Sequence, residues 1–102
     1  MGAVIEKGKT MIHDNAKLVY DIRFQNGYRN QIWLSFNHNT GEPIVWQRVL
    51  STKTNTWTKF KRSTGRNISA MVKELRELLA TNVATITNAP HESIVDAFNA
   101  CE

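Results

Sequence analysis

The chain has 102 residues, of which 41% are hydrophobic and 22% charged, a composition typical of one folded domain. Its single cysteine, Cys101, excludes an internal disulfide framework, which favours a reducing compartment. No stretch approaches the roughly 18 apolar residues of a membrane span, and the first residues lack the apolar run of a signal peptide. We therefore expect a protein that is not secreted and that lies in the cytoplasm or at the nucleoid.

Positive charge is concentrated in the middle of the chain. The formal net charge is +4, but residues 22–73 contain nine basic residues and a single acid, Glu42. A field of one sign over half a domain predicts a polyanionic partner. The alternative is a basic surface that only keeps the protein in solution.

The first half of the chain reads as a series of β-strands. Alternation over residues 17–24 predicts a half-buried strand whose core-facing side chains are Leu18, Tyr20, Ile22 and Phe24. Asn26-Gly27 is a strong hairpin signal. The second strand, residues 28–37, has one side that we expect to face the core, formed by Ile32, Leu34 and Phe36, while its other side carries Gln31, Trp33 and Ser35.

Two further strands are expected before the first helix. In residues 44–50 we assign the valines of the strand to the core, and this assignment places Trp46 and Arg48 beside Trp33 on the outer face. A shift of one residue would reverse it. In residues 57–62 the same alternation predicts that Phe60 faces the core and that the outward side chains are Trp57, Lys59 and Lys61.

The clearest helix signal lies in residues 68–82. Apolar side chains recur there at helical spacing, and Ser69 is the expected N-cap. Pro90 and Glu92 predict a short helix that continues to Asn99. The apolar stripe of the first helix comprises Ile68, Met71, Val72, Leu75, Leu78 and Leu79.

The predicted fold is therefore of the α+β class, with a four-stranded antiparallel meander, one long amphipathic helix and a short C-terminal helical tail. We expect an N-terminal arm over residues 1–15, a domain over residues 16–82 and a C-terminal extension over residues 83–102. A domain this small buries a limited fraction of its surface, so a homodimer is expected.

Motifs for catalysis are missing from the sequence. The three histidines are scattered, no cluster has metal-ligand spacing, and no glycine-rich loop could hold a phosphate. Carboxylates are few and lie mostly outside the predicted sheet, which disfavours a general acid and base pair. We expect no catalytic residues, no metal, no cofactor, no small-molecule substrate and no membrane partner.

The outer face of the predicted sheet interleaves tryptophan with arginine and lysine. Aromatic rings stack on exposed bases and basic side chains neutralise phosphates, so this pattern is typical of binding to single-stranded DNA or RNA. The structural alternative is that each tryptophan is buried against another element or subunit. The expected nucleic-acid contacts are Arg23, Arg29, Trp33, Trp46, Arg48, Lys53, Trp57, Lys59, Lys61, Arg62 and Arg66.

A family resemblance rests on three short segments. Residues 65–69, Gly-Arg-Asn-Ile-Ser, form a strand-to-helix junction, residues 44–48 form an apolar strand that ends in Arg48, and residues 17–24 read as a Pur-type strand. Over residues 17–82 the chain resembles the positive cofactor four family of transcriptional coactivators, whose wider group includes the plant Whirly proteins and the Pur repeats. The resemblance implies a non-catalytic homodimer that binds single strands, with Arg48 and Arg66 among the contacts.

The chain also departs from that family. It has no long tail rich in serine and lysine, its junction lacks one glycine, and it carries an additional C-terminal segment. These departures suit a compact prokaryotic or phage protein. We expect a largely sequence-independent single-stranded DNA-binding protein that acts in replication, recombination or transcription. An RNA-binding protein, and a protein-interaction module or inhibitor of a nucleic-acid enzyme, stay open as alternatives.

Overall fold

The structure is a computed structural model that describes residues 15–102, so the arm expected at the N-terminus lies, apart from Asn15, outside the described residues. An antiparallel meander is formed by β1 (Lys17–Phe24), β2 (Arg29–Phe36) and β3 (Pro43–Ser51). β3 pairs in turn with β4 (Thr56–Trp57) and β5 (Lys61–Ser63), and β6 (Ala84–Ile86) pairs with β1 at the opposite edge.

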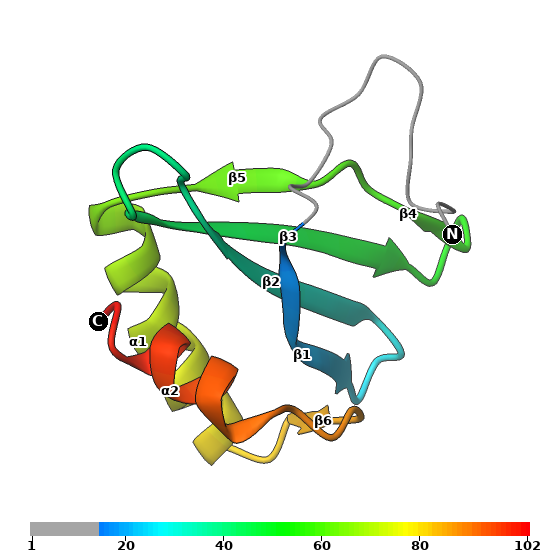
Figure 1. Ribbon diagram of the computed structural model, residues 1–102. Coiled ribbons are helices and arrows are strands. Elements are labelled where there is room, and N and C mark those ends of the chain that lie inside the picture. Colours follow the sequence, from blue (N-terminus) through cyan, green and yellow to red (C-terminus); the bar gives the residue numbers. More distant parts are fainter. Residues whose placement is uncertain (1–14) are drawn as a thin grey trace.

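Two helices cover one side of this sheet. α1 (Arg66–Ala80) follows β5, and α2 (Glu92–Asn99) follows β6, so that the two helices lie side by side (Figure 1). The α+β class and the C-terminal helical tail are thus confirmed. The sheet has six strands rather than the expected four. α1 has 15 residues and is not the long helix that was expected. No helix within residues 15–102 is long and apolar enough to span a membrane.

The main core lies between the sheet and the helices. Val45 is fully buried there, as expected for β3, whereas Val49 is only half-buried and lies outside this core. Phe36 is the exception among the expected core residues of β2 because it is 39% exposed. The buried members of this core are Val19, Tyr20, Ile22, Ile32, Leu34, Val45, Ile68, Val72, Leu75, Ala84 and Phe98.

A β-bulge interrupts the alternation of β1. Leu18 pairs with Trp33 and Tyr20 with Ile32, so one additional residue lies between the two pairs. A bulge changes which face the neighbouring side chains occupy. Val19 is therefore fully buried with the helices, whereas Leu18 is only half-buried, and the prediction that Leu18 faces the core was wrong.

The side chain of Asn88 supports β1 at this bulge. Its Oδ1 accepts a hydrogen bond from the backbone N–H of Asp21 at 2.8 Å, and its Nδ2 donates to the carbonyl of Val19 at 3.2 Å. Thr87 donates to the carbonyl of Asp21 through both its backbone N–H (2.7 Å) and its hydroxyl (2.9 Å). The segment after β6 thus satisfies backbone groups that a longer neighbouring strand would otherwise pair.

The predicted fourth strand is split by a second offset of one residue. Leu50 pairs with Trp57, but Gln47 pairs with Lys61, so the segment between β4 and β5 contains one residue more than a regular ladder would. Past this offset the alternation is reversed. Phe60 packs on the face away from the helices and Lys61 lies on the opposite face from Trp46, so both of these predictions were wrong.

α1 begins earlier than expected. Its N-cap is Gly65 rather than Ser69, and Gly65 has φ of 59° and ψ of −131°. A residue with a Cβ atom is strained in that conformation, so glycine suits the sharp turn from β5 into the helix. Ile68, Val72 and Leu75 then form the buried face of α1.

The C-terminal segment packs into the same core as the rest of the chain. Phe98 is 1% exposed, and its ring meets that of Tyr20 edge-on with 6.0 Å between the centroids. Arg76 on α1 also forms an ion pair with Glu102. α2 is therefore held to the core by buried apolar contacts, and the chain end after it is held to α1 by an ion pair.

We predict that Phe98→Ala lowers the free energy of unfolding by roughly 3 kcal/mol, because it removes a large buried ring and leaves a cavity. Urea unfolding followed by circular dichroism measures the effect. Asp96→Ala, an exposed position on the same helix, is the matched control and should change stability by less than about 0.5 kcal/mol. Equal stability of the two variants would mean that α2 does not contribute to the core.

Candidate nucleic-acid interface

The open face of the sheet is the side away from the helices. On it β2 and β3 place Trp33 opposite Trp46 and Gln31 opposite Arg48. The expected juxtaposition of these side chains is therefore present. The structure adds how deeply each is buried and what each one contacts.

Two of the tryptophans form a second, smaller core on the open face. Trp46 is 3% exposed and its indole N–H donates to the hydroxyl of Ser35 at 2.9 Å. Trp33 is half-buried and meets Phe60 edge-on with 6.4 Å between the centroids. The indole nitrogen of Trp33 is buried and meets no acceptor within residues 15–102. Ile44 and Phe60 complete this core, so Trp46 offers little ring surface to a ligand.

Trp57 lies at the rim of this face and is only half-buried. The guanidinium carbon of Arg48 lies 4.3 Å from the centroid of the Trp57 ring, and that of Arg29 lies 5.3 Å away. Arg48 also lies 4.9 Å from the centroid of Phe60. Such contacts contribute about 0.5–1 kcal/mol at exposed sites and more when water is excluded. They hold the two arginines against the aromatic surface.

A nearly buried carboxylate organises these arginines. Asp21 is 8% exposed, forms an ion pair with Arg29 and accepts a hydrogen bond from the Gln31 amide at 3.0 Å. The other end of the Gln31 amide accepts from Nε of Arg48 at 2.8 Å. A continuous polar chain thus runs from Asp21 through Gln31 to the arginine that lies on Trp57.

The pKa of Asp21 reflects these contacts. Burial by itself raises the pKa of the carboxyl group, but hydrogen bonds from Arg29 and Gln31 and the charge of Arg29 outweigh burial, so the pKa falls below its usual value. Asp21 is therefore ionised at neutral pH and compensates the charge of Arg29. Arg29 is accordingly more a part of the framework of the face than a phosphate contact.

The remaining predicted contacts do not all lie on the open face, and Arg66 is the first residue of α1. Arg62 on β5 lies opposite Trp46 on β3, and its guanidinium carbon lies 5.9 Å from the centroid of that ring. Arg23 lies opposite Arg29 at the end of β1. Lys61 lies on the opposite face of β5 from the open face. The predicted basic residues that are exposed are Arg23, Lys53, Lys59, Lys61, Arg62 and Arg66.

Sequence reasoning missed the roles of Asp21 and Gln31. Alternation placed both on the outer face, and a single acid opposite several arginines was the available signal. Phe60 was missed because the offset between β4 and β5 reverses its face.

Within residues 15–102 no group of three or more His, Cys, Asp and Glu side chains could hold a metal ion. No protein-family model matches the chain, and no curated protein or solved structure is similar to it at a significant level.

We predict that Asp21→Asn lowers the free energy of unfolding by about 1–3 kcal/mol at pH 7, because Arg29 loses its charged partner. The folded-state pKa of Asp21 is lowered, so its contribution is complete above the unfolded value of about 3.9 and is lost as the pH falls through the folded value. Urea unfolding of both proteins should therefore give stabilities that converge below pH 4. A difference that stays constant down to pH 2 would contradict the role of the carboxylate.

Proposed function

We propose that the protein is a non-catalytic single-stranded DNA-binding protein, largely independent of sequence, that acts in replication, recombination or transcription. The observation that carries this proposal is the half-buried ring of Trp57 at the rim of the open face, with the guanidinium carbon of Arg48 4.3 Å from its centroid. Aromatic rings and arginine planes both stack on bases, and each stacked base contributes roughly 1–3 kcal/mol.

Exposed positive charge lies close to this aromatic surface. Lys59 and Arg62 are exposed on either side of Phe60, and Lys53 is exposed in the turn between β3 and β4. Lysine and arginine in these places can neutralise the phosphates of a strand whose bases stack near Trp57. Stacking and charge compensation together favour a single strand, because only unpaired bases present their flat faces.

Duplex DNA fits this arrangement less well. Recognition of a duplex in the major groove requires a helix or a two-stranded ribbon that fits the groove. Beyond its first residue, Arg66, the exposed face of α1 carries Lys73, Glu74, Arg76 and Glu77, whose charges balance. Such a face provides little attraction for a polyanion, and the basic rim of the sheet is the better site.

The binding experiment measures the anisotropy of labelled oligo(dT) during titration with the protein. We expect an affinity that falls steeply with salt, and we expect Trp57→Ala to weaken binding by about tenfold because one stacking surface is lost. An equal-length oligo(U) compares RNA with DNA. If saturating protein at low salt leaves the anisotropy of oligo(dT) unchanged, the proposal is wrong.

Two exposed lysines provide a matched control for this experiment. Lys59 lies beside the aromatic surface, whereas Lys73 lies on α1, on the other side of the molecule from the open face. If Lys59 contacts one phosphate, Lys59→Ala should reduce the slope of log affinity against log salt by about 0.7. Lys73→Ala removes the same charge and should leave the slope unchanged. Equal slopes for the two variants would indicate that the affinity reflects net charge alone.

We also propose that the protein acts as a homodimer. Its domain is small, and Val83 is a large apolar side chain that is 39% exposed beside the end of α1. The helices are the proposed interface because they leave the open face accessible. Light scattering should give twice the 11.7 kDa mass of one chain, and Val83→Asp should shift the mass toward that of the monomer. A monomer at high micromolar concentration would contradict this.

A further inference from the structure

Gln31 lies between two charged side chains in the sheet. β1 and β2 pair Asp21 with Gln31, and β2 and β3 pair Gln31 with Arg48, so the three residues form one row across the strands. The Gln31 amide donates to the carboxylate of Asp21 at 3.0 Å and accepts from Nε of Arg48 at 2.8 Å. The middle of the row is thus a neutral side chain that contacts a carboxylate on one side and a guanidinium on the other.

The two partners dictate which way the Gln31 amide is turned. An ionised carboxylate only accepts hydrogen bonds and Nε of an arginine only donates one, so the nitrogen of the amide faces Asp21 and its oxygen faces Arg48. A carboxylate in place of Gln31 would repel Asp21, and a basic side chain there would repel Arg48. An amide of this length satisfies both neighbours.

The hydrogen bond from Arg48 to Gln31 bears on how the arginine lies against the aromatic rings. Its guanidinium carbon lies 4.3 Å from the centroid of Trp57 and 4.9 Å from that of Phe60. Trp57 pairs with Leu50, two residues along β3 from Arg48, so the arginine reaches the ring diagonally. The guanidinium is therefore held by contacts from β2, from β4 and from the segment before β5.

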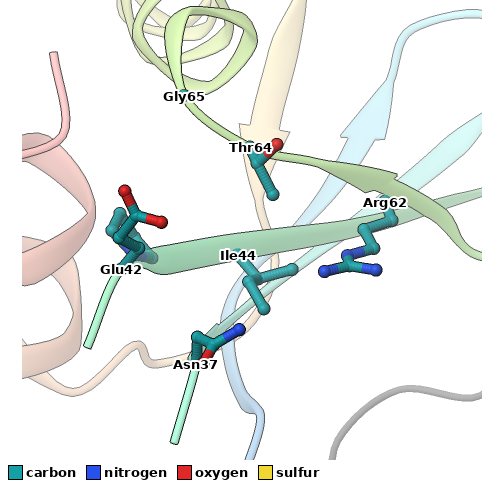
Figure 2. A pocket seen from close by; sticks show the side chains of 7 residues that line it. Asn37, Glu42, Ile44, Arg62, Thr64 and Gly65 are labelled. Carbon is teal, nitrogen blue, oxygen red and sulfur yellow. The ribbon is translucent and has the colours of Figure 1, made fainter. Parts of the chain in front are cut away.

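A second arginine of the open face is held differently. Arg62 extends from β5 toward Ile44, at a pocket of about 340 Å³ that lies at the other end of β3 from Trp57 (Figure 2). Its guanidinium carbon lies 5.9 Å from the centroid of Trp46, and the group forms no hydrogen bond or ion pair with residues 15–102. Arg48 and Arg62 thus carry the same charge on the same face, and of the two it is Arg48 that a neighbouring strand fixes by a hydrogen bond.

We infer that Gln31 is a positioning residue for the surface that we propose to bind a strand, because it fixes the guanidinium of Arg48 against Trp57 and Phe60 before the strand arrives. A long side chain that rotates freely loses rotamer freedom when it contacts a ligand, and this loss weakens binding. An arginine that is already fixed loses less. The inference rests on the proposed function and assigns to Gln31 an effect on affinity that acts through Arg48, without contact between Gln31 and the strand.

The experiment is a double-mutant cycle on the affinity for oligo(dT), measured by anisotropy. Gln31→Met keeps the length of the side chain but removes both hydrogen bonds, and we expect it to weaken binding about fivefold. In an Arg48→Met background the same change should weaken binding less than about twofold, because the residue through which Gln31 acts is gone. In an Arg62→Met background, which removes the same charge, Gln31→Met should again weaken binding about fivefold. Equal losses in all three backgrounds would mean that Gln31 acts on the strand directly or through the fold, which overturns the inference.

Gln47→Met is the matched control on the same pair of strands. Nε2 of Gln47 donates to Oδ1 of Asn30 at 3.2 Å, so this side chain also bridges β2 and β3, but Gln47 adjoins Arg48 in sequence and lies on the opposite face of β3. Its replacement should leave the affinity unchanged, and urea unfolding identifies conditions in which all variants are folded. If Gln47→Met weakens binding as much as Gln31→Met does, a general loosening of the sheet accounts for both effects and the inference is wrong.

A measurement on the protein without DNA tests the positioning separately. In NMR spectra the Nε–H of Arg48 should give a signal that exchanges slowly with water, and Gln31→Met should shift this signal and speed its exchange. An unchanged signal would overturn the inference whether or not the protein binds DNA. A changed signal in a protein that leaves the anisotropy of oligo(dT) unaltered would instead overturn the proposed function, and Gln31 would then be a structural residue alone.

Discussion

Burial of the central strands on both faces is the constraint on which the rest of the structure depends. On the helix side of β3 Val45 is fully buried, and on the other side Trp46 is 3% exposed. Because α1 and α2 cover only one face, the sheet must cover the other face with its own large side chains. The hydroxyl of Ser35 satisfies the indole N–H of Trp46, which allows the whole ring to be buried. Packing therefore uses most of the aromatic surface, and the half-buried ring of Trp57 at the rim is the part that we propose for a ligand.

The arginines of that rim depend on the same region of β1 as the C-terminal half of the chain. The side chain of Asp21 binds Arg29 and Gln31, while its backbone is held by Thr87 and Asn88. The segment after β6 therefore stabilises the strand position from which the carboxylate acts. Asp21 thus links the arrangement of the open face to the attachment of the C-terminal segment, although the two lie on different faces of the sheet.

Much of this fold follows from simple periodicity, and the exceptions have a common cause. Alternation predicts β1 to β3, and helical spacing predicts α1, because these patterns repeat over eight or more residues. Neither side of β3 is cleanly apolar in sequence, so the outward facing of Trp46 was assigned from its place beside Trp33. Val19 and Phe60 were misassigned because a single inserted residue reverses the alternation and leaves no mark in the sequence. β6 has three residues, too few for a pattern. Burial of each tryptophan was an open alternative from the sequence, and it holds for Trp46 because Phe60 lies on the same face.

The positive charge follows the β5 edge of the sheet rather than filling one face. Lys61 and Arg62 are neighbours that lie on opposite faces, and Lys59 lies in the segment before them. Under the proposed function, a strand bound along this edge would meet the ring of Trp57 and the exposed charges of Lys59 and Arg62. Stacking and charge compensation would then arise from separate side chains, so that each contribution can be removed without the other.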